Sequence, residues 1–537
     1  MIALSEVWKI YNLPGRWCRQ RDFRHWQAKV PTMEKMPRSG NQLGSFRQRW
    51  ILLTLLLMLG SVLRLVAIDK QSLWTDEIYS LGLASADLTS IMAGRAGDNH
   101  TPPLYYFLLH LWIRSGTSEF VLRSLSAAFG VGAIWGVYLL GKNLFGPRVG
   151  LVSSALMTFS PYHIYYSQEA RMYTLVTLLT VISTYCFLRG LSERKDKFWV
   201  GFLISSVLSI YTHYYSIFIL IGQSIFIFMF FRDYRPLITK WILLQSFILL
   251  SYLPWIGVVL RLSESGGQSF RASPFSMIPY AFFRFNAGYS LFPINYQMKG
   301  DISKAIHENL PLIALVFMVF VPILLHAVWT SRMEKKELTL LLILLLLPAL
   351  LAFAISLRVP MLSERYLIVS TPAYFVLLAL GLDSIRRRRL KGVAVVGVAL
   401  VFGFSLYNYY FSGKFGKEQW RSVASYVQAA AKPDDLLLFD ASFVRSNFDY
   451  YYSGSLKRYG LPQPTNGILN NVIKALDGRD RIWLILSHQP SDFYKNWLRA
   501  RYQVLDEKIF PLETGIFVYL FEATRGSAGD SRELGRI

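Results

Sequence analysis

The chain has 537 residues, of which 53% are hydrophobic and only 17% charged, and its mean hydropathy is +0.32. Because soluble domains carry about 25% charged residues, this composition indicates a membrane protein and excludes disordered, collagen-like and disulfide-scaffold proteins. Lys and Arg outnumber Asp and Glu by 57 to 34, for a net charge of +23. The basic residues concentrate between apolar segments, where the bias toward cytoplasmic loops explains them, so we expect no nucleic-acid partner. Cys18 lies in a basic tail and Cys186 in an apolar segment, so neither is placed to form a structural disulfide.

Residues 1–50 form a basic tail that lacks the apolar core of a secretory signal, and we expect this tail to be cytoplasmic. The apolar segments lie within 51–411, which we expect to form the transmembrane domain. The segment 104–113 has about ten residues, whereas a helix needs about 20 to cross about 30 Å of hydrocarbon, so it is predicted to be interfacial or re-entrant. Eleven spans are then predicted at 51–68, 120–140, 149–165, 172–188, 198–212, 215–231, 241–260, 310–329, 338–357, 366–382 and 393–411.

The basic clusters between these spans test the assignment, because they should all lie on the cytoplasmic side. The clusters at 142–148, 189–197, 232–240, 332–336 and 386–391 all do. Loops 69–119 and 261–309 then face outward. We therefore predict a multi-pass protein of the cytoplasmic (plasma) membrane, with a cytoplasmic N terminus.

Residues 412–537 are much less hydrophobic, and after eleven spans they lie outside the membrane on the outer face. Helical spacing over 418–431 and buried strands at 436–439 and 482–486 indicate a small α/β domain. The predicted fold class is thus an all-α polytopic membrane protein with interfacial helices and a small extracytoplasmic α/β domain.

Two adjacent carboxylates, Asp76 and Glu77, lie among aromatic and apolar residues after the first predicted span. Where water is scarce, a carboxylate has a raised pKa or needs a balancing cation, and both conditions produce general bases and metal ligands. The alternative is structural, because Thr75-Asp76-Glu77 also fits the cap of an interfacial helix. The spacing alone leaves both interpretations open.

A second polar cluster, at 98–106, contains His100 and Tyr105, and two prolines in it fix an extended entry into the next helix. Taken singly, His100 fits a solvated loop residue.

Three more clusters join predicted spans on the same outer side, where ionisable residues are functional candidates. Glu169 and Arg171 also fit a simple ion pair with each other. His213 also fits a helix-end histidine, and Arg365 a snorkelling arginine. The clusters are Glu169 with Arg171, His213, and Arg365 with Tyr366.

All five clusters fall on one face of a topology that the basic residues define independently. Carboxylates, arginines and histidines gathered there make a site able to hold an anionic lipid headgroup and to deprotonate a nucleophile.

These residues resemble the membrane glycosyltransferases of the GT-C fold, specifically the dolichyl-phosphate-mannose protein mannosyltransferase-like family, which includes lipid A aminoarabinose transferases. The resemblance covers about residues 50–385. One departure is Thr101, which separates His100 from the proline pair. The motifs that carry the resemblance are Asp76-Glu77, the His-Thr-Pro-Pro-Leu stretch at 100–104, residues 160–171, Thr-His-Tyr at 212–214 and Glu-Arg-Tyr at 364–366.

The resemblance implies inverting transfer of a single sugar from a polyprenyl-phosphate donor to a hydroxyl acceptor on the outer face, within a catalytic domain at 51–411. The acceptor is a protein, lipid A, another glycolipid or a wall polymer. Asp76 would be the general base, with Glu77 orienting the acceptor or tuning the pKa of Asp76. Arg171 and Arg365 would bind the donor phosphate. The residues assigned to substrate binding are His100, Glu169, Tyr105, His213 and Tyr366.

No metal is expected to be obligatory, although Asp76, His100 and Glu169 have the oxygen and nitrogen donors that Mg²⁺ or Mn²⁺ would need. Two other functions compete with sugar transfer. A transporter or flippase of a lipid-linked sugar would also have many spans, but the paired halves typical of transporters are missing. An oligosaccharyltransferase differs only in moving a whole glycan. The C-terminal domain is expected to help select the acceptor.

Overall fold

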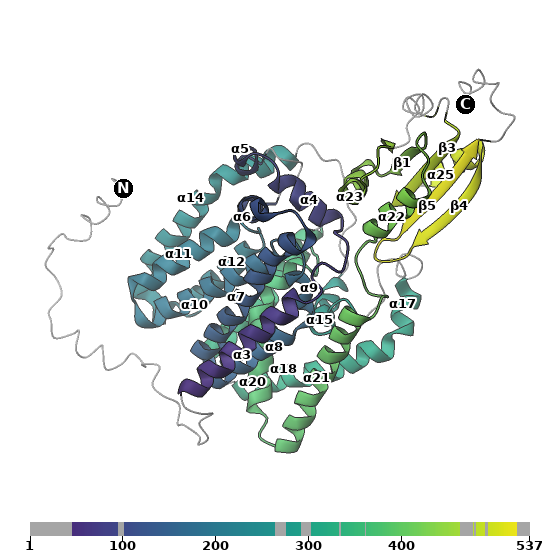
Figure 1. The fold of residues 1–537 in the computed structure, drawn as a ribbon. Helices are drawn as coiled ribbons and strands as arrows, with labels where there is room; N and C mark the ends of the chain where they lie inside the picture. Colours follow the sequence, from purple (N-terminus) through teal and green to yellow (C-terminus); the bar gives the residue numbers. More distant parts are fainter. Residues whose placement is uncertain are drawn as a thin grey trace, which may run out of the picture. The chain divides into compact units, whose positions relative to one another are not determined.

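The structure, a computed structural model, describes residues 46–94, 101–263, 275–291, 302–331, 335–359, 361–461, 476, 479–488 and 492–523. Two parts are visible in Figure 1, a bundle of helices and a C-terminal domain with a mixed sheet. This agrees with the fold class predicted from the sequence. The predicted tail at 1–50 lies almost wholly outside the described residues, and the first described helix, α3, begins at Phe46.

Eight segments in the described part of the chain are long and apolar enough to cross a membrane. Every one of them overlaps a span predicted from the sequence. They are α3 (Phe46–Leu65), α7 (Glu119–Phe145), α10 (Tyr173–Glu193), Phe231–Val258 with most of α14 (Ile238–Ser263), α18 (Leu310–Thr330), α19 (Lys335–Ser356), Tyr366–Ser384 with α20 (Thr371–Ser384), and α21 (Arg388–Phe411).

The predicted count of eleven spans is not confirmed, because three of the predicted spans correspond to shorter helices. These are α8 (Pro147–Phe159), α11 (Asp196–Ile210) and α12 (Ser216–Met229), with 13, 15 and 14 residues. The predicted span 149–165 is broken at Ser160, where α8 ends and α9 (Pro161–Ser167) begins. The backbone N–H of His163 donates to Ser160 Oγ at 3.2 Å, and Pro161 occupies the first turn, so the sequence starts a new helix at this point.

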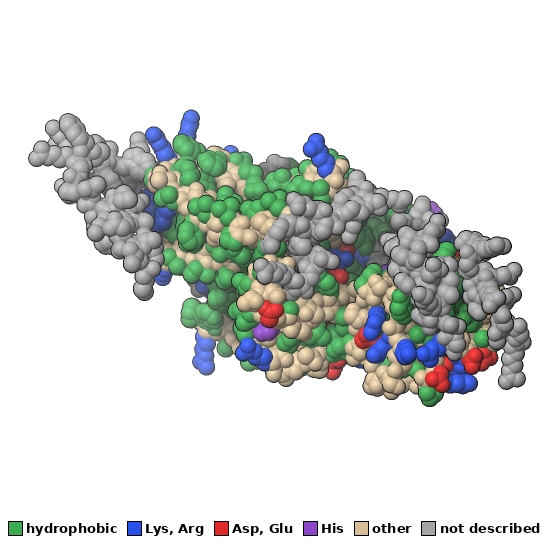
Figure 2. Space-filling view, turned by 90° about the horizontal axis from the view of Figure 1, so that it is seen from above, with side chains coloured by type: hydrophobic (Ala, Val, Ile, Leu, Met, Phe, Trp, Pro, Cys, Tyr) green, Lys and Arg blue, Asp and Glu red, His purple; other side chains and the backbone are tan. Residues whose placement is uncertain are grey.

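The bundle is layered around α20, which lies in the most buried of the eight segments: 89% of the Tyr366–Ser384 window is buried. α7 packs against both α8 and α10, and α20 packs against α8 and α18. α14 lies at the periphery, where Leu243, Leu249 and Leu250 are about 60% exposed. In Figure 2, hydrophobic side chains cover much of the visible face of the bundle, whereas acidic and basic side chains gather over the C-terminal domain. An apolar exterior of this kind is expected where lipid replaces water.

Short helices lie in the described parts of the two long segments that the sequence assigned to outward loops. α4 (Thr75–Ala84), α5 (Leu88–Met92) and α6 (Leu104–Trp112) follow α3, and α15 (Met277–Ala287) and α17 (Ile302–Glu308) precede α18. α6 has nine residues, too few to span a membrane, and it packs against α4 and α5.

The C-terminal domain contains a five-stranded sheet in the order β2-β1-β3-β5-β4, visible at the upper right of Figure 1. β1 (Leu436–Asp440) pairs in parallel with β2 (Lys457–Leu461) and β3 (Arg481–Ser487), whereas β5 (Ile516–Ala523) is antiparallel to β3 and β4 (Tyr502–Phe510). The strands predicted at 436–439 and 482–486 are the two central parallel strands.

Both faces of this sheet are buried, which explains why β1 and β3 read as continuous apolar runs. Leu437, Phe439, Trp483 and Ile485 point to the side covered by α22 (Trp420–Ala430) and α23 (Arg445–Tyr451). The alternate residues of the same strands point to the side covered by α25 (Asp492–Arg499).

Candidate functional site

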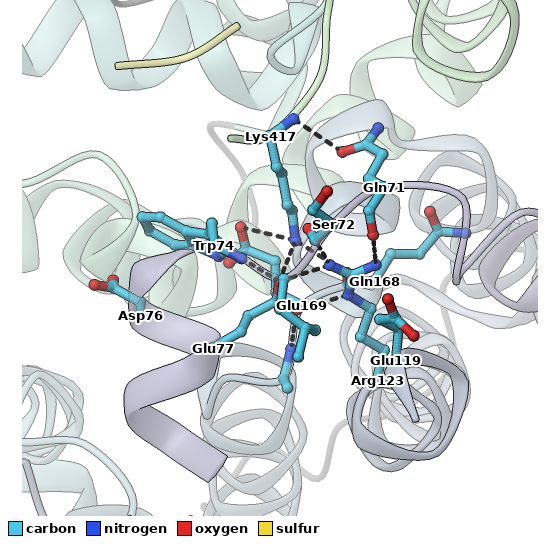
Figure 3. A network of polar contacts seen from close by, with 12 residues as sticks. Gln71, Ser72, Trp74, Asp76, Glu77, Glu119, Arg123, Gln168, Glu169 and Lys417 are labelled. Atoms are coloured by element: carbon cyan, nitrogen blue, oxygen red, sulfur yellow. Dashed lines mark hydrogen bonds and ion pairs between the residues drawn. The ribbon is translucent and has the colours of Figure 1, made fainter. Parts of the chain in front are cut away.

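The candidate site is built around the first turn of α4, which carries Asp76 and Glu77. The backbone N–H of Trp74 donates to Glu77 Oε2 at 3.4 Å, so the sequence does form a helix start here, as the structural interpretation of this motif predicted. Consecutive residues on a helix diverge by about 100°, and the two carboxylates therefore enter different surroundings. Figure 3 shows Asp76 pointing away from the polar network into which Glu77 extends.

Glu77 is completely buried and fully engaged with protein groups. Its two oxygens accept hydrogen bonds from Nε and Nη2 of Arg123, both at 2.7 Å, and Oε1 also accepts from the backbone N–H of Ala170 at 2.9 Å. Lys417 Nζ lies 3.4 Å from Oε2. Burial raises the pKa of Glu77, but Arg123 and Lys417 outweigh it and lower the pKa to about 2. The carboxylate is therefore ionised at neutral pH.

Arg123 ties this carboxylate to the loop that leads into α4. Its guanidinium donates to the backbone oxygens of Ile68, Gln71 and Ser72 at 2.7 to 2.9 Å. A single buried arginine thereby joins α7 to the segment between α3 and α4.

Glu169, in the turn between α9 and α10, lies beside this network with 1% exposure. Among the described residues, no hydrogen-bond donor reaches either of its carboxylate oxygens. Lys417 Nζ, 3.5 Å from Oε1, is its ion-pair partner. Burial raises the pKa of Glu169, and the negative charges of Glu77 and Asp76 add to that effect while Lys417 opposes it. The pair of Glu169 with Arg171 that the sequence left open does not form.

Asp76 lies on the accessible side of α4 and pairs with Arg365. Arg365 Nη1 is 2.9 Å from Asp76 Oδ2, and the two side chains are 33% and 32% exposed. The guanidinium also lies over the ring of Trp74, 5.6 Å from its centre. Chain segments almost 290 residues apart are thus joined at this carboxylate.

Arg171 lies beneath Asp76 and is 7% exposed. Its Nη1 donates weakly to the backbone oxygen of Asp76 at 3.4 Å and to the hydroxyls of Ser80 and Tyr106 at 3.2 and 3.3 Å. Within the described residues its Nε–H has no acceptor. A buried guanidinium N–H without an acceptor is costly, so this arginine has unused capacity for an anion.

The remaining predicted site residues lie in different places. His213 contacts Tyr366, with ring centres 4.9 Å apart, and Tyr366 lies 6.4 Å from Tyr173. Burial, with a smaller effect of Arg171, lowers the pKa of His213 to about 3, so its ring is neutral. The hydroxyl of Tyr105 is 2.8 Å from Ser126 Oγ inside the bundle. His100 lies outside the described residues.

Of the residues proposed as metal ligands, Asp76 and Glu169 lie in the part of the chain that the structure describes, and His100 does not. No three His, Cys, Asp or Glu side chains there come together as a ligand set. Asp76 pairs with Arg365, and Lys417 faces Glu169. Cationic side chains therefore stand next to both carboxylates.

Three residues of this region were not predicted. Arg123 carries a usable signal, because it is an arginine inside the apolar segment predicted at 120–140, where ionisable residues are functional candidates. Lys417 and Glu418 carry none, because they follow the last span in a short polar stretch. Their positions depend on how the C-terminal domain folds back on α4.

A bundle of membrane helices with short surface helices and a carboxylate beside two arginines is the arrangement expected of the GT-C membrane glycosyltransferases. Comparison with known proteins finds the same resemblance. Residues 100–257 match the dolichyl-phosphate-mannose-protein mannosyltransferase family, so the resemblance predicted from the sequence is confirmed. No curated protein sequence matches.

Solved structures with the same fold extend over nearly the whole chain. ArnT from Cupriavidus metallidurans in the apo state has a TM-score of 0.58 and 13% identity, covering 88% of this chain and 98% of its own. The same protein bound to undecaprenyl phosphate has a TM-score of 0.54 and 12% identity, with the same coverage. An Archaeoglobus fulgidus oligosaccharyltransferase is less similar, with a TM-score of 0.49 and 13% identity, covering 81% of this chain and 67% of its own.

Proposed function

We propose that the protein is an inverting glycosyltransferase that moves a single sugar from a polyprenyl-phosphate donor to a hydroxyl acceptor on the outer face of the membrane. One observation carries the proposal: Asp76 is held at the accessible side of α4 by Arg365, next to the unused N–H of Arg171. A base and two arginines side by side suit a reaction in which a hydroxyl loses a proton and a phosphate gains charge. The complex of ArnT with undecaprenyl phosphate supports a lipid-phosphate donor.

In the proposed reaction, Asp76 takes the proton of the acceptor hydroxyl while its oxygen attacks the anomeric carbon. A bond forms between acceptor oxygen and anomeric carbon, and the bond from that carbon to the phosphate oxygen breaks on the opposite side, which inverts the configuration. Arg365 and Arg171 take up the charge of the leaving lipid phosphate by charge-assisted hydrogen bonds. Before the acceptor arrives, Arg365 holds the Asp76 carboxylate in place through their ion pair at 2.9 Å.

Glu77 has a positioning role in this scheme. Its oxygens are committed to Arg123, Ala170 and Lys417, and it fixes the first turn of α4. His213, Tyr173 and Tyr366 are proposed to line the sugar site, because the Tyr173 hydroxyl is buried and has no partner among the described residues.

The experiment measures sugar transfer to a membrane extract by purified protein. One arm supplies radiolabelled polyprenyl-phosphate hexoses and the other supplies polyprenyl-linked oligosaccharides, each with and without chelator. Asp76→Asn should lower transfer by about a hundredfold or more, the range typical of general-base catalysis. Asp69→Asn, which changes an exposed aspartate in the same loop, is the matched control.

Consumption of the oligosaccharide donor instead would identify an oligosaccharyltransferase. Full activity of Asp76→Asn, or no consumption of any donor by folded wild-type protein, would reject the proposal and leave transport of a lipid-linked sugar to be tested.

A further inference from the structure

Two consecutive charged residues, Lys417 and Glu418, are buried in the stretch that follows the last membrane helix. Lys417 is 3% exposed and Glu418 is completely buried, whereas Lys414, three residues earlier, is exposed. Charged side chains are almost never fully buried unless they are paired. The partners of this dipeptide therefore indicate what the C-terminal domain does at the site.

The ammonium group of Lys417 is enclosed by groups of the helical bundle. Its Nζ donates to the backbone oxygen of Gln168 at 3.2 Å and lies 3.4 Å from Glu77 Oε2 and 3.5 Å from Glu169 Oε1. It also lies 5.5 Å from the ring centre of Tyr165. Figure 3 shows the lysine reaching from the C-terminal side into the space between the two carboxylates.

The two glutamates depend on this lysine to different degrees. Glu77 already has two short hydrogen bonds to Arg123. Glu169 has no hydrogen bond from the described residues and relies on the ion pair with Lys417. The other charged groups whose fields reach this carboxylate are Asp76, Glu77, Arg365 and Glu513.

Glu418 fixes the backbone next to Lys417, because its carboxylate forms hydrogen bonds with the start of α4. Its Oε2 accepts from the backbone N–H and the hydroxyl of Thr75 at 3.3 and 3.1 Å and from Trp420 Nε1 at 2.6 Å. Its Oε1 is 3.1 Å from His488 Nε2 and accepts from the Thr514 hydroxyl at 3.2 Å. The residue before Asp76 is thus bonded directly to the C-terminal domain.

We propose that Lys417 is the fixed cation of the candidate site. It is a positioning residue, supplied by the C-terminal domain, and its ammonium group pairs with Glu169 at the place where a metal ion would otherwise be needed. Two buried carboxylates around one cation are a typical setting for a divalent ion, and here a tethered ammonium occupies it. The C-terminal domain then completes the site itself, in addition to any role in choosing the acceptor. The inference rests on the proposed function only in assigning this site to catalysis.

The test uses full-length protein with Lys417→Met, Glu169→Gln and the double variant, and Lys414→Met as the control. The midpoint of thermal unfolding is measured for each. Lys417→Met should lower the midpoint, because it leaves a buried carboxylate without a cation. In the Glu169→Gln background the same substitution should cost less than half as much, because the carboxylate that needs the cation is gone.

Equal loss in both backgrounds would overturn the proposal, because the lysine would then act through packing alone. If Lys417→Met does not fold, a folded double variant supports the proposal, and failure of the double variant while Glu169→Gln folds overturns it.

A second readout distinguishes this inference from the proposed function. Lys417→Ala should reduce sugar transfer by about ten- to a hundredfold, since small displacements of a catalytic group cost that much. Methylammonium chloride should restore part of the activity, whereas sodium chloride of equal concentration should not. If wild-type protein transfers no sugar but the unfolding compensation is observed, the proposed function fails and the cation role of Lys417 stands.

Discussion

The two adjacent carboxylates in the first turn of α4, Asp76 and Glu77, lie in opposite environments. Asp76 is one-third exposed and has one ionic partner among the described residues, Arg365. Glu77 is fully buried and is bonded to Arg123 and Ala170, with Lys417 alongside. A carboxylate that must exchange protons with a substrate needs the first environment, and one that holds a fold together needs the second. An adjacent acidic pair in a sequence can therefore divide into one chemical and one structural residue, because the helix turns them apart.

Arg123→Met is the largest expected disruption of the buried side. The substitution removes the hydrogen bonds from Arg123 to Glu77 and leaves that carboxylate with Lys417 and the backbone N–H of Ala170. Breaking a buried pair in this way costs about 3 to 5 kcal/mol. Thermal or denaturant unfolding of the purified protein measures the loss. Arg148→Met is the control, because its pair with Asp383 is half exposed and should contribute at most about 1 kcal/mol. Equal effects of the two variants would refute the contrast between buried and accessible pairs.

Asp76→Asn and Glu77→Gln should separate activity from stability. A hundredfold loss of transfer in Asp76→Asn corresponds to about 2.7 kcal/mol of activation free energy, and the midpoint of unfolding should hardly change because the side chain is accessible. Glu77→Gln should lower the midpoint clearly, since the amide cannot satisfy Arg123 and Lys417 as the carboxylate does. Parallel measurements of transfer rate and unfolding test this. A Glu77→Gln variant that is stable but inactive would show that Glu77, and not Asp76, carries the chemistry.

The sequence contains enough information to single out most of the charged residues near this site, but not the partners of the buried carboxylate Glu77. Asp76, Arg171 and Arg365 each stand out as polar residues at the ends of apolar segments, and a topology based on basic residues brings them to one face. The partners of Glu77 are harder to predict, because Arg123 and Lys417 are far from it in sequence and only Arg123 is marked by an apolar surrounding. The number of spans is not confirmed, in part because hydropathy does not register the break at Ser160 and Pro161, which divides one apolar segment into α8 and α9.

The pH dependence of stability offers a weaker test of the same contrast. The pKa of Glu77 is lowered from 4.5 to about 2 in the folded protein, so its ionisation stabilises the fold above about pH 4.5, and that stability is lost as pH falls toward 2. Unfolding midpoints of wild type and Glu77→Gln should therefore differ most above pH 5 and converge on acidification. A difference that stays constant down to pH 3 would mean that Glu77 acts through shape and not through charge.

Tyr105→Phe should have the smallest effect. It tests whether the Tyr105 hydroxyl binds the substrate or only supports the fold. The sequence assigned this residue to substrate binding, and the structure places its hydroxyl 2.8 Å from Ser126 Oγ, whose own hydroxyl donates to the backbone oxygen of Arg171 at 3.0 Å. Removing the phenolic hydroxyl deletes one buried hydrogen bond, worth about 1 kcal/mol of stability. If Tyr105 only supports the loop that carries Arg171, the transfer rate and the apparent KM for the acceptor should stay within about threefold of wild type, which is less than one hydrogen bond to the substrate would contribute. A larger rise in KM without a change in the unfolding midpoint would show that the hydroxyl contacts the substrate directly.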